Sequence, residues 1–355
     1  MSHCNRALNL ILTNPMMVRN LWLGQRMQFN RLRRREFITL LSGAVTWPLA
    51  ARAQQARQPA RIGFLRAAPL PDHIIAALRR GLSEHGYHEG TTFTLVPSWG
   101  DGNLDWLPEL AKSLVDAGVD IILSDGTSTA QAAHGATVTV PIVMAGGNDP
   151  VRAGLATSLA RPGGNVTGFA TQVIELTGKT FEVTTEILPG IVQIGVIDPR
   201  GVGGPFRAAE AEAAKALGLQ LAYVEIGDLG AEGIDQAIRQ ARDKVQAAVV
   251  RGSPFLSSTQ RKLIVERAAF HRLPTIYEMR DFVELGGLAS YGTDFTELFR
   301  LAAGYIVKIL NGTKAGDLPI EQATKFELVI NLTTAKKLGL SVSPVMLARA
   351  NEVIE

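Results

Sequence analysis

Three consecutive hydroxyl side chains, Thr127, Ser128 and Thr129, are the leading candidates for chemistry in this sequence. They follow a short apolar run and Gly126, at the point where a helix is predicted to begin. Hydroxyls at a helix amino terminus lie beside free backbone N–H groups and the positive end of the helix dipole, which together suit a carboxylate. The alternative is that Ser128 or Thr129 only caps the helix. The two interpretations are compatible.

Two aspartates follow predicted strands and are candidates to pair with an ammonium group of a ligand. They are Asp149 and Asp198. The structural alternative is that each carboxylate caps the next helix. For Asp149 this alternative has a clear basis, because Pro150 suits a first helical position and a helix is then predicted as far as about Ala160.

Aromatic and further charged residues follow other predicted strands. Tyr277 and Tyr291 offer ring faces that stack on an aromatic ligand, with packing in the core as the alternative. Glu278 and Asp294 are weaker ligand candidates. Two arginines, Arg66 and Arg251, also follow strands and would suit an acidic ligand, although exposed charges at the lip of a pocket are commoner.

Motifs for catalysis and for metal or cofactor binding are incomplete. His85 and His88 do not share a helical face, and no other histidine has a ligand partner nearby in the sequence. Gly201 and Gly203 begin a dinucleotide fingerprint, but Phe206 occupies the position of its third glycine. We therefore expect no metal, no cofactor and no enzymatic activity.

The elements that must position these residues alternate between strands and helices. Short apolar runs near residues 61–65, 92–96, 119–123 and 142–145 are separated by helical patterns, and the alternation starts again after residue 169. This order predicts two doubly wound parallel sheets, whose ligand sites lie beyond the carboxyl ends of the strands. Residues 165–169 are interpreted as an extended link out of the first sheet.

Several stretches resemble one family. Pro141 to Gly168, with Asn148-Asp149-Pro150-Val151 and Arg161-Pro162-Gly163-Gly164-Asn165, is similar to the signature of ABC-transporter substrate-binding proteins that include tryptophan-binding proteins. Arg61 to Leu65, Gly286-Gly287-Leu288 and the tail from Leu318 to Glu355 also fit, so the similarity covers nearly the whole chain after the amino-terminal segment.

The resemblance implies a type I periplasmic binding fold, in which two lobes are joined by three crossings. Lobe 1 is then expected at 60–168 plus 293–325, and lobe 2 at 169–292 plus 326–355. The implied function is delivery of a small organic solute, particularly an aromatic amino acid, to an ABC permease and its ATPase. A monomer that hinges on binding is expected.

The amino-terminal segment has the pattern of an export signal. Arg34-Arg35 precede an apolar stretch too short to span a membrane, and Ala51-Arg52-Ala53 suits a signal peptidase, so we expect cleavage after Ala53. Both twin-arginine export and general secretion fit. Met27 is the expected true start, and residues 1–26 an upstream extension. A periplasmic protein without a membrane anchor follows, because Cys4, which is the only cysteine, lies in the removed part.

Net charge argues against a nucleic-acid partner. The whole chain carries +3, but residues 1–53 contribute a surplus of +7, which leaves the remainder at −4. Two other functions stay open beside import. A sensory domain for a membrane signalling partner would share the fold, and a nucleotide-dependent enzyme would share the doubly wound sheet.

Overall fold

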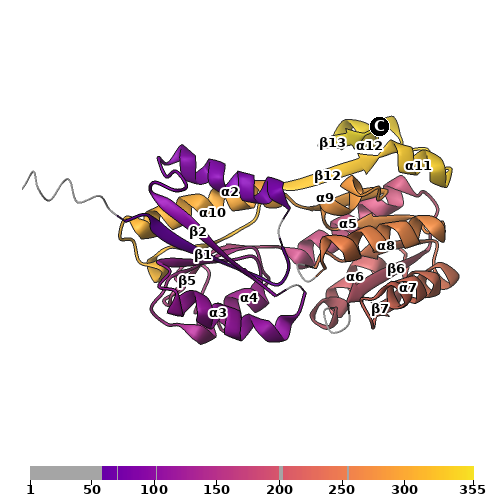
Figure 1. Ribbon diagram of the computed structural model, residues 1–355. Coiled ribbons are helices and arrows are strands. Elements are labelled where there is room, and N and C mark those ends of the chain that lie inside the picture. The colour runs from indigo at the N-terminus through magenta and orange to yellow at the C-terminus, as the bar shows by residue number, and fades with distance from the viewer. Residues whose placement is uncertain (1–57, 70, 101, 200–202, 254–255) are drawn as a thin grey trace, which may run out of the picture. The chain divides into compact units, whose positions relative to one another are not determined.

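The computed structural model describes residues 58–69, 71–100, 102–199, 203–253 and 256–355 (Figure 1). The predicted signal segment, the start at Met27 and the cleavage after Ala53 lie outside these residues. Among the helices of the described part, none combines the length and the apolar character needed to cross a membrane.

The first sheet has six strands, all parallel. Its strand order is β11-β5-β4-β3-β1-β2. Apolar side chains dominate the central strands because both faces are covered by helices. The strands are β1 (Ala60–Arg66), β2 (Phe93–Trp99), β3 (Ile121–Ser124), β4 (Ile142–Ala145), β5 (Val166–Ala170) and β11 (Ile320–Gln322).

Helices cover this sheet on both faces, and together they form lobe 1. On one face α2 (Asp72–Glu84) packs against α10 (Phe295–Leu310), and the two lie side by side in Figure 1. A second core cluster contains residues of α3 (Leu107–Asp116) and α4 (Thr127–Ala136). Each helix buries one apolar face against the strands.

The second sheet has seven strands in the order β13-β12-β10-β9-β8-β6-β7. All neighbours are parallel except β10 and β12, which run antiparallel because the chain enters β12 from lobe 1. The strands are β6 (Gln193–Pro199), β7 (Gln220–Ile226), β8 (Ala247–Val250), β9 (Thr275–Tyr277), β10 (Ala289–Thr293), β12 (Phe326–Asn331) and β13 (Glu352–Ile354).

This sheet and its helices form lobe 2. The helices are α5 (Val173–Ile187), α6 (Arg207–Ala216), α7 (Ala231–Lys244), α8 (Ser258–Phe270), α9 (Arg280–Glu284), α11 (Leu332–Leu338) and α12 (Pro344–Arg349). Two core clusters fill the lobe: one contains residues of α5 and α6, the other residues of α7 and α8. The predicted fold class, two doubly wound lobes of the type I binding fold, is confirmed.

The chain passes between the lobes after β5, after β10 and after β11. The expected link at residues 165–169 is wrong, because Val166–Ala170 is strand β5 of the first sheet. Gly168 makes its pairing possible: its φ is +118°, and a Cβ there would lie 2.2 Å from the Met144 carbonyl oxygen. The chain therefore leaves lobe 1 after residue 170.

The helix predicted from Asp149 to Ala160 is also wrong, since only a single turn forms. Gly154 ends it with a φ of +75°, while its N–H bonds to the Val151 carbonyl and the Leu155 N–H bonds to the Pro150 carbonyl. This pair of bonds is the usual glycine helix stop. The sequence contained the signal, because a glycine four residues after Pro150 ends the helix before it can propagate.

Replacing Gly81 with alanine should lower the free energy of unfolding by about 1–3 kcal/mol, because helices α2 and α10 touch at this residue. An added Cβ would lie 2.4 Å from the Arg300 carbonyl oxygen. Urea denaturation measures the change. Gly135→Ala is the matched control: its Cβ would meet nothing within 4 Å, so it should be neutral or stabilise α4 by about 0.5–1 kcal/mol. Equal effects at both glycines would contradict the close helix contact.

Candidate functional site

A cavity of about 1020 Å³ is lined by residues of both lobes, which belong to one compact unit. Its lining comes from the carboxyl ends of strands in the two sheets, as expected for parallel sheets. Representative lining residues are Arg66 of β1, Gly126 after β3, Asn148 after β4, Arg251 after β8 and Gly292 of β10. Most of the exposed lining surface is apolar, as is typical of a site for a small organic ligand, but many polar and charged side chains also line the cavity.

The amino terminus of α4 opens onto this cavity. Its N-cap residue Gly126 is extended and offers no side chain to the first N–H groups of the helix. Thr127, Ser128 and Thr129 all line the cavity. Backbone donors and the helix dipole therefore point at the ligand space, which favours an anionic group there.

The three hydroxyls are not equivalent. The Thr127 hydroxyl is bonded to the backbone of Asn148, accepting from its N–H at 2.8 Å. Thr129 is buried, and its hydroxyl donates to the Gly126 carbonyl at 2.9 Å. Ser128 is half-buried, and within the described residues its hydroxyl has no hydrogen-bond partner in the protein. Ser128 is thus the hydroxyl best placed to meet a ligand.

Asp149 lies at the same cavity and also stabilises its own loop. Its φ is 36°, unusual for a residue with a side chain, and its Oδ1 accepts the Arg152 N–H at 3.0 Å. The neighbouring Asn148 side chain accepts a hydrogen bond from the Thr171 hydroxyl at 2.9 Å. Asn148 and Thr171 both line the cavity and were not predicted, since a single amide or hydroxyl gives no motif.

Asp198, in contrast, is not at the cavity. It lies inside β6 rather than after it, and its fully buried carboxylate pairs with Arg251 Nε at 2.7 Å and with Arg207 Nη2 at 2.9 Å. The sequence predicts that Asp198 pairs with a ligand ammonium group or caps a helix. In the structure its carboxylate pairs with these two guanidinium groups instead. A buried carboxylate without such partners would be strongly destabilising.

Tyr277 belongs to the core instead of the cavity. It is 1% exposed, and its ring stacks on Phe282 with centroids 4.7 Å apart. Burial raises the pKa of its hydroxyl. Tyr291 is half-buried and does line the cavity, together with Phe206 and Phe295, which were not predicted as ligand contacts. The buried Phe299 is also part of the lining, so four aromatic side chains line the cavity.

Three arginines at the cavity are almost completely buried. Arg66 and Arg251 are each 3% exposed, so the expectation that they are exposed lip charges is wrong. Arg66 pairs with Asp125, and Arg251 with Asp198 and Glu210. Arg261, which the sequence did not single out, donates to Asp281 at 2.6 Å, and burial lowers the pKa of its guanidinium. The partners are required because an unpaired buried charge is strongly destabilising.

The two weaker acidic candidates have different positions. Glu278 lines the cavity, where burial raises the pKa of its carboxyl, and its Oε2 accepts the Gly252 N–H at 2.9 Å. Asp294 is the N-cap of α10 and accepts the Glu297 N–H at 2.9 Å. Asp294 therefore has a structural role that explains its position after β10.

Glu327 at the cavity should make stability depend on pH. Burial raises the pKa of this carboxyl to about 7 from an ordinary 4.5, although Arg280 opposes the shift. Between these values the folded protein holds a proton that the unfolded chain has lost, so stability falls as pH rises. We expect the free energy of unfolding to fall by about 2 kcal/mol from pH 5 to pH 7 through this group.

Glu327→Gln should remove that component of the pH profile, as measured by urea denaturation at pH 5, 6, 7 and 8. The matched control is Glu352→Gln, which removes an exposed carboxylate paired with the same Arg280. If both variants keep the wild-type profile, Glu327 is ionised throughout this range.

A comparison with protein families identifies the chain. The family profile described as ABC transporter substrate binding protein matches residues 67–354. The chain belongs to this family. Its members are solute-binding proteins rather than enzymes, and they serve ABC transporters outside the cytoplasm.

Two similar proteins are described by an amino acid that they bind. A tyrosine-binding protein of Clostridioides difficile (strain R20291) is 28% identical over 261 residues, which cover 74% of this chain and 75% of the relative. An ABC domain from Streptococcus pneumoniae, solved in complex with L-Trp, is 26% identical with a TM-score of 0.75, covering 84% of this chain and 100% of that one.

A third similar structure is a conserved domain protein from Vibrio cholerae O1 biovar El Tor strain N16961. It is 27% identical, has a TM-score of 0.76, and covers 83% of this chain and 100% of that chain. The substrate-binding family and the two-lobed fold expected from the sequence are thereby confirmed.

Proposed function

We propose that this chain is the solute-binding component of an ABC importer and that it binds an aromatic amino acid in the cavity between its lobes. The observation that carries the proposal is the cavity itself, where an uncapped α4 amino terminus faces the same space as four aromatic side chains. The relatives that bind tyrosine and L-Trp support an amino acid as the ligand class.

Within this cavity each ligand group has a matching protein group. The ligand carboxylate lies at the α4 amino terminus, against the N–H groups and hydroxyl of residues 127–129. Asp149 pairs with the ammonium group, and Tyr291 contacts the aromatic ring, helped by Phe206 and Phe295. Asp198 and Tyr277 do not contact the ligand in this proposal and instead stabilise lobe 2.

The same proposal covers location and partners. The chain is exported by its cleaved signal segment, works in the periplasm as a monomer, and delivers its solute to a membrane permease driven by an ATPase. Ligand contacts made only with the lobes closed shift the population toward the closed form, with the three crossings between the lobes as hinges.

A ligand panel tests this function. Isothermal titration with L-tyrosine, L-tryptophan and L-phenylalanine should give one-to-one binding for at least one of them. The corresponding amines, which lack the carboxylate, should bind at least about 100-fold more weakly, because the α4 donors lose their charged acceptor. No binding of any amino acid, or equal binding of acid and amine, would contradict the proposal.

A further inference from the structure

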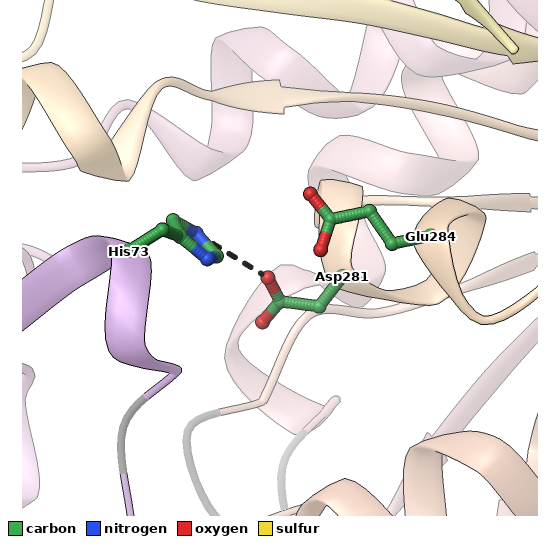
Figure 2. A group of neighbouring side chains, drawn as sticks. All are labelled: His73, Asp281 and Glu284. Atoms are coloured by element: carbon green, nitrogen blue, oxygen red, sulfur yellow. Dashed lines mark ion pairs between the residues drawn. The ribbon is translucent and has the colours of Figure 1, made fainter.

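Three potential metal ligands from the two lobes lie close together (Figure 2), and two of them, His73 and Asp281, also line the cavity. His73 lies near the start of α2 in lobe 1, whereas Asp281 and Glu284 lie on α9 in lobe 2. One ligand atom from each residue lies within 4.8 Å of the other two. Because His73 is distant in sequence from both acids, only the folded chain brings them together.

The geometry leaves one oxygen of each carboxylate available. Asp281 Oδ2 accepts from Arg261 Nη1 at 2.6 Å, and Glu284 Oε1 accepts from Arg280 Nε at 2.9 Å. The other Asp281 oxygen, Oδ1, faces His73 Nε2 at 3.8 Å, as the dashed line in Figure 2 marks. This distance is too long for a hydrogen bond.

The Nε2 atom of His73 is available to bind a metal ion. The nitrogen atom is buried and has no hydrogen-bond partner among the described residues. Such a buried ring nitrogen is costly unless something bonds to it. A metal ion between Nε2 and Oδ1 would satisfy the imidazole, whereas a direct hydrogen bond would require the two groups to move closer.

We propose that His73, Asp281 and Glu284 bind a divalent transition-metal ion, with Zn²⁺ as the suitable probe. Imidazole nitrogen and carboxylate oxygen are both ligand types that zinc accepts, and three protein ligands leave a fourth position open for water. Arg261 and Arg280 fix the orientation of the carboxylates, as hydrogen-bonded partners of metal ligands commonly do. Their positive charges also offset the carboxylates, so the site is weaker than a closed structural zinc site.

The consequence is a link between metal and solute, and this part rests on the proposed function. Because the ligands come from both lobes, a bound metal favours the arrangement of the lobes in which the three ligands meet, and we propose that bound solute favours the same arrangement. By thermodynamic reciprocity the metal then raises solute affinity by the same factor by which the solute raises metal affinity. The metal site itself does not depend on any solute being bound.

The test uses the full chain without an affinity tag, first treated with a chelator and kept free of amino acids. Titration with ZnCl₂ should show a binding event that raises the Tm. His73→Ala and Glu284→Gln should each weaken that event at least about tenfold, while His85→Ala, an exposed histidine at the other end of α2, should leave it unchanged.

Two results would overturn the proposal: no zinc binding by the intact chain, or equal binding by the intact chain and both cluster variants. Folding of each variant is checked by its Tm without metal. The Mn²⁺ electron paramagnetic resonance signal gives a second measurement, because it should lose intensity on adding wild-type protein and stay unchanged with Glu284→Gln. Since no solute is present, failure here leaves the amino-acid panel as an independent test of the proposed function.

Discussion

Replacing Arg251 with methionine should lower the free energy of unfolding by about 3–5 kcal/mol, because two carboxylates would be left in the interior without this partner. Asp198 and Glu210 are both 0% exposed, and Arg251 contacts each of them. Methionine keeps much of the volume of the side chain, so the lower free energy of unfolding results from the missing charge rather than from a cavity. Urea denaturation at pH 7 measures it.

Arg300→Met is the matched control, because Arg300 lies at the surface. Arg300 also pairs with two acids, Glu84 and Glu297, but in partial contact with water. Its loss should lower the free energy of unfolding by less than about 1 kcal/mol. Adding Asp198→Asn and Glu210→Gln to Arg251→Met should recover part of the loss, because the two buried carboxylates that lost this partner are then replaced by neutral amides. Similar losses for Arg251→Met and Arg300→Met would contradict the buried network.

Replacing Ser128 with aspartate should weaken binding of a carboxylate-bearing solute at least about 100-fold while leaving the fold intact. A like charge beside the ligand carboxylate costs several kcal/mol, and about 2.7 kcal/mol corresponds to this factor. The same aspartate is favourable for the helix, since an acid in the first turn stabilises it by about 0.3–1 kcal/mol. Affinity and stability therefore move in opposite directions.

Isothermal titration and thermal denaturation of the same sample measure the two effects. Ser128→Asn, which matches the aspartate in size without its charge, should change affinity by less than about tenfold. If Ser128 were only a helix cap, the aspartate variant would bind the solute as well as the wild type does. That result would remove the α4 amino terminus from the proposed site.

Long amphipathic helices such as α7 and α10 were predictable from the sequence because their apolar residues recur at helical spacing. In the structure each of them buries one face. Short edge elements were not predictable, and β11, β13 and α9 were missed. Three to five residues contain too little periodicity to distinguish a strand or a helix from a loop.

The cavity was predictable in outline, since the ends of parallel strands meet and the residues after them face one space. Eight of the predicted candidates line it: Thr127, Ser128, Thr129, Asp149, Tyr291, Glu278, Arg66 and Arg251. What the sequence does not reveal is which buried charges pair with one another. Arg66 and Asp125 are 59 residues apart, and Arg251 and Asp198 are 53 apart, so their burial depends on tertiary packing alone.

We propose that the cavity holds a solute and releases it unchanged. Equilibrium dialysis of the purified chain against the tightest amino acid of the panel, followed by denaturation and mass spectrometry of what is released, tests it most directly. We expect one molecule of solute per chain, recovered with its original mass. A chemically altered product, or no retained solute, would contradict it.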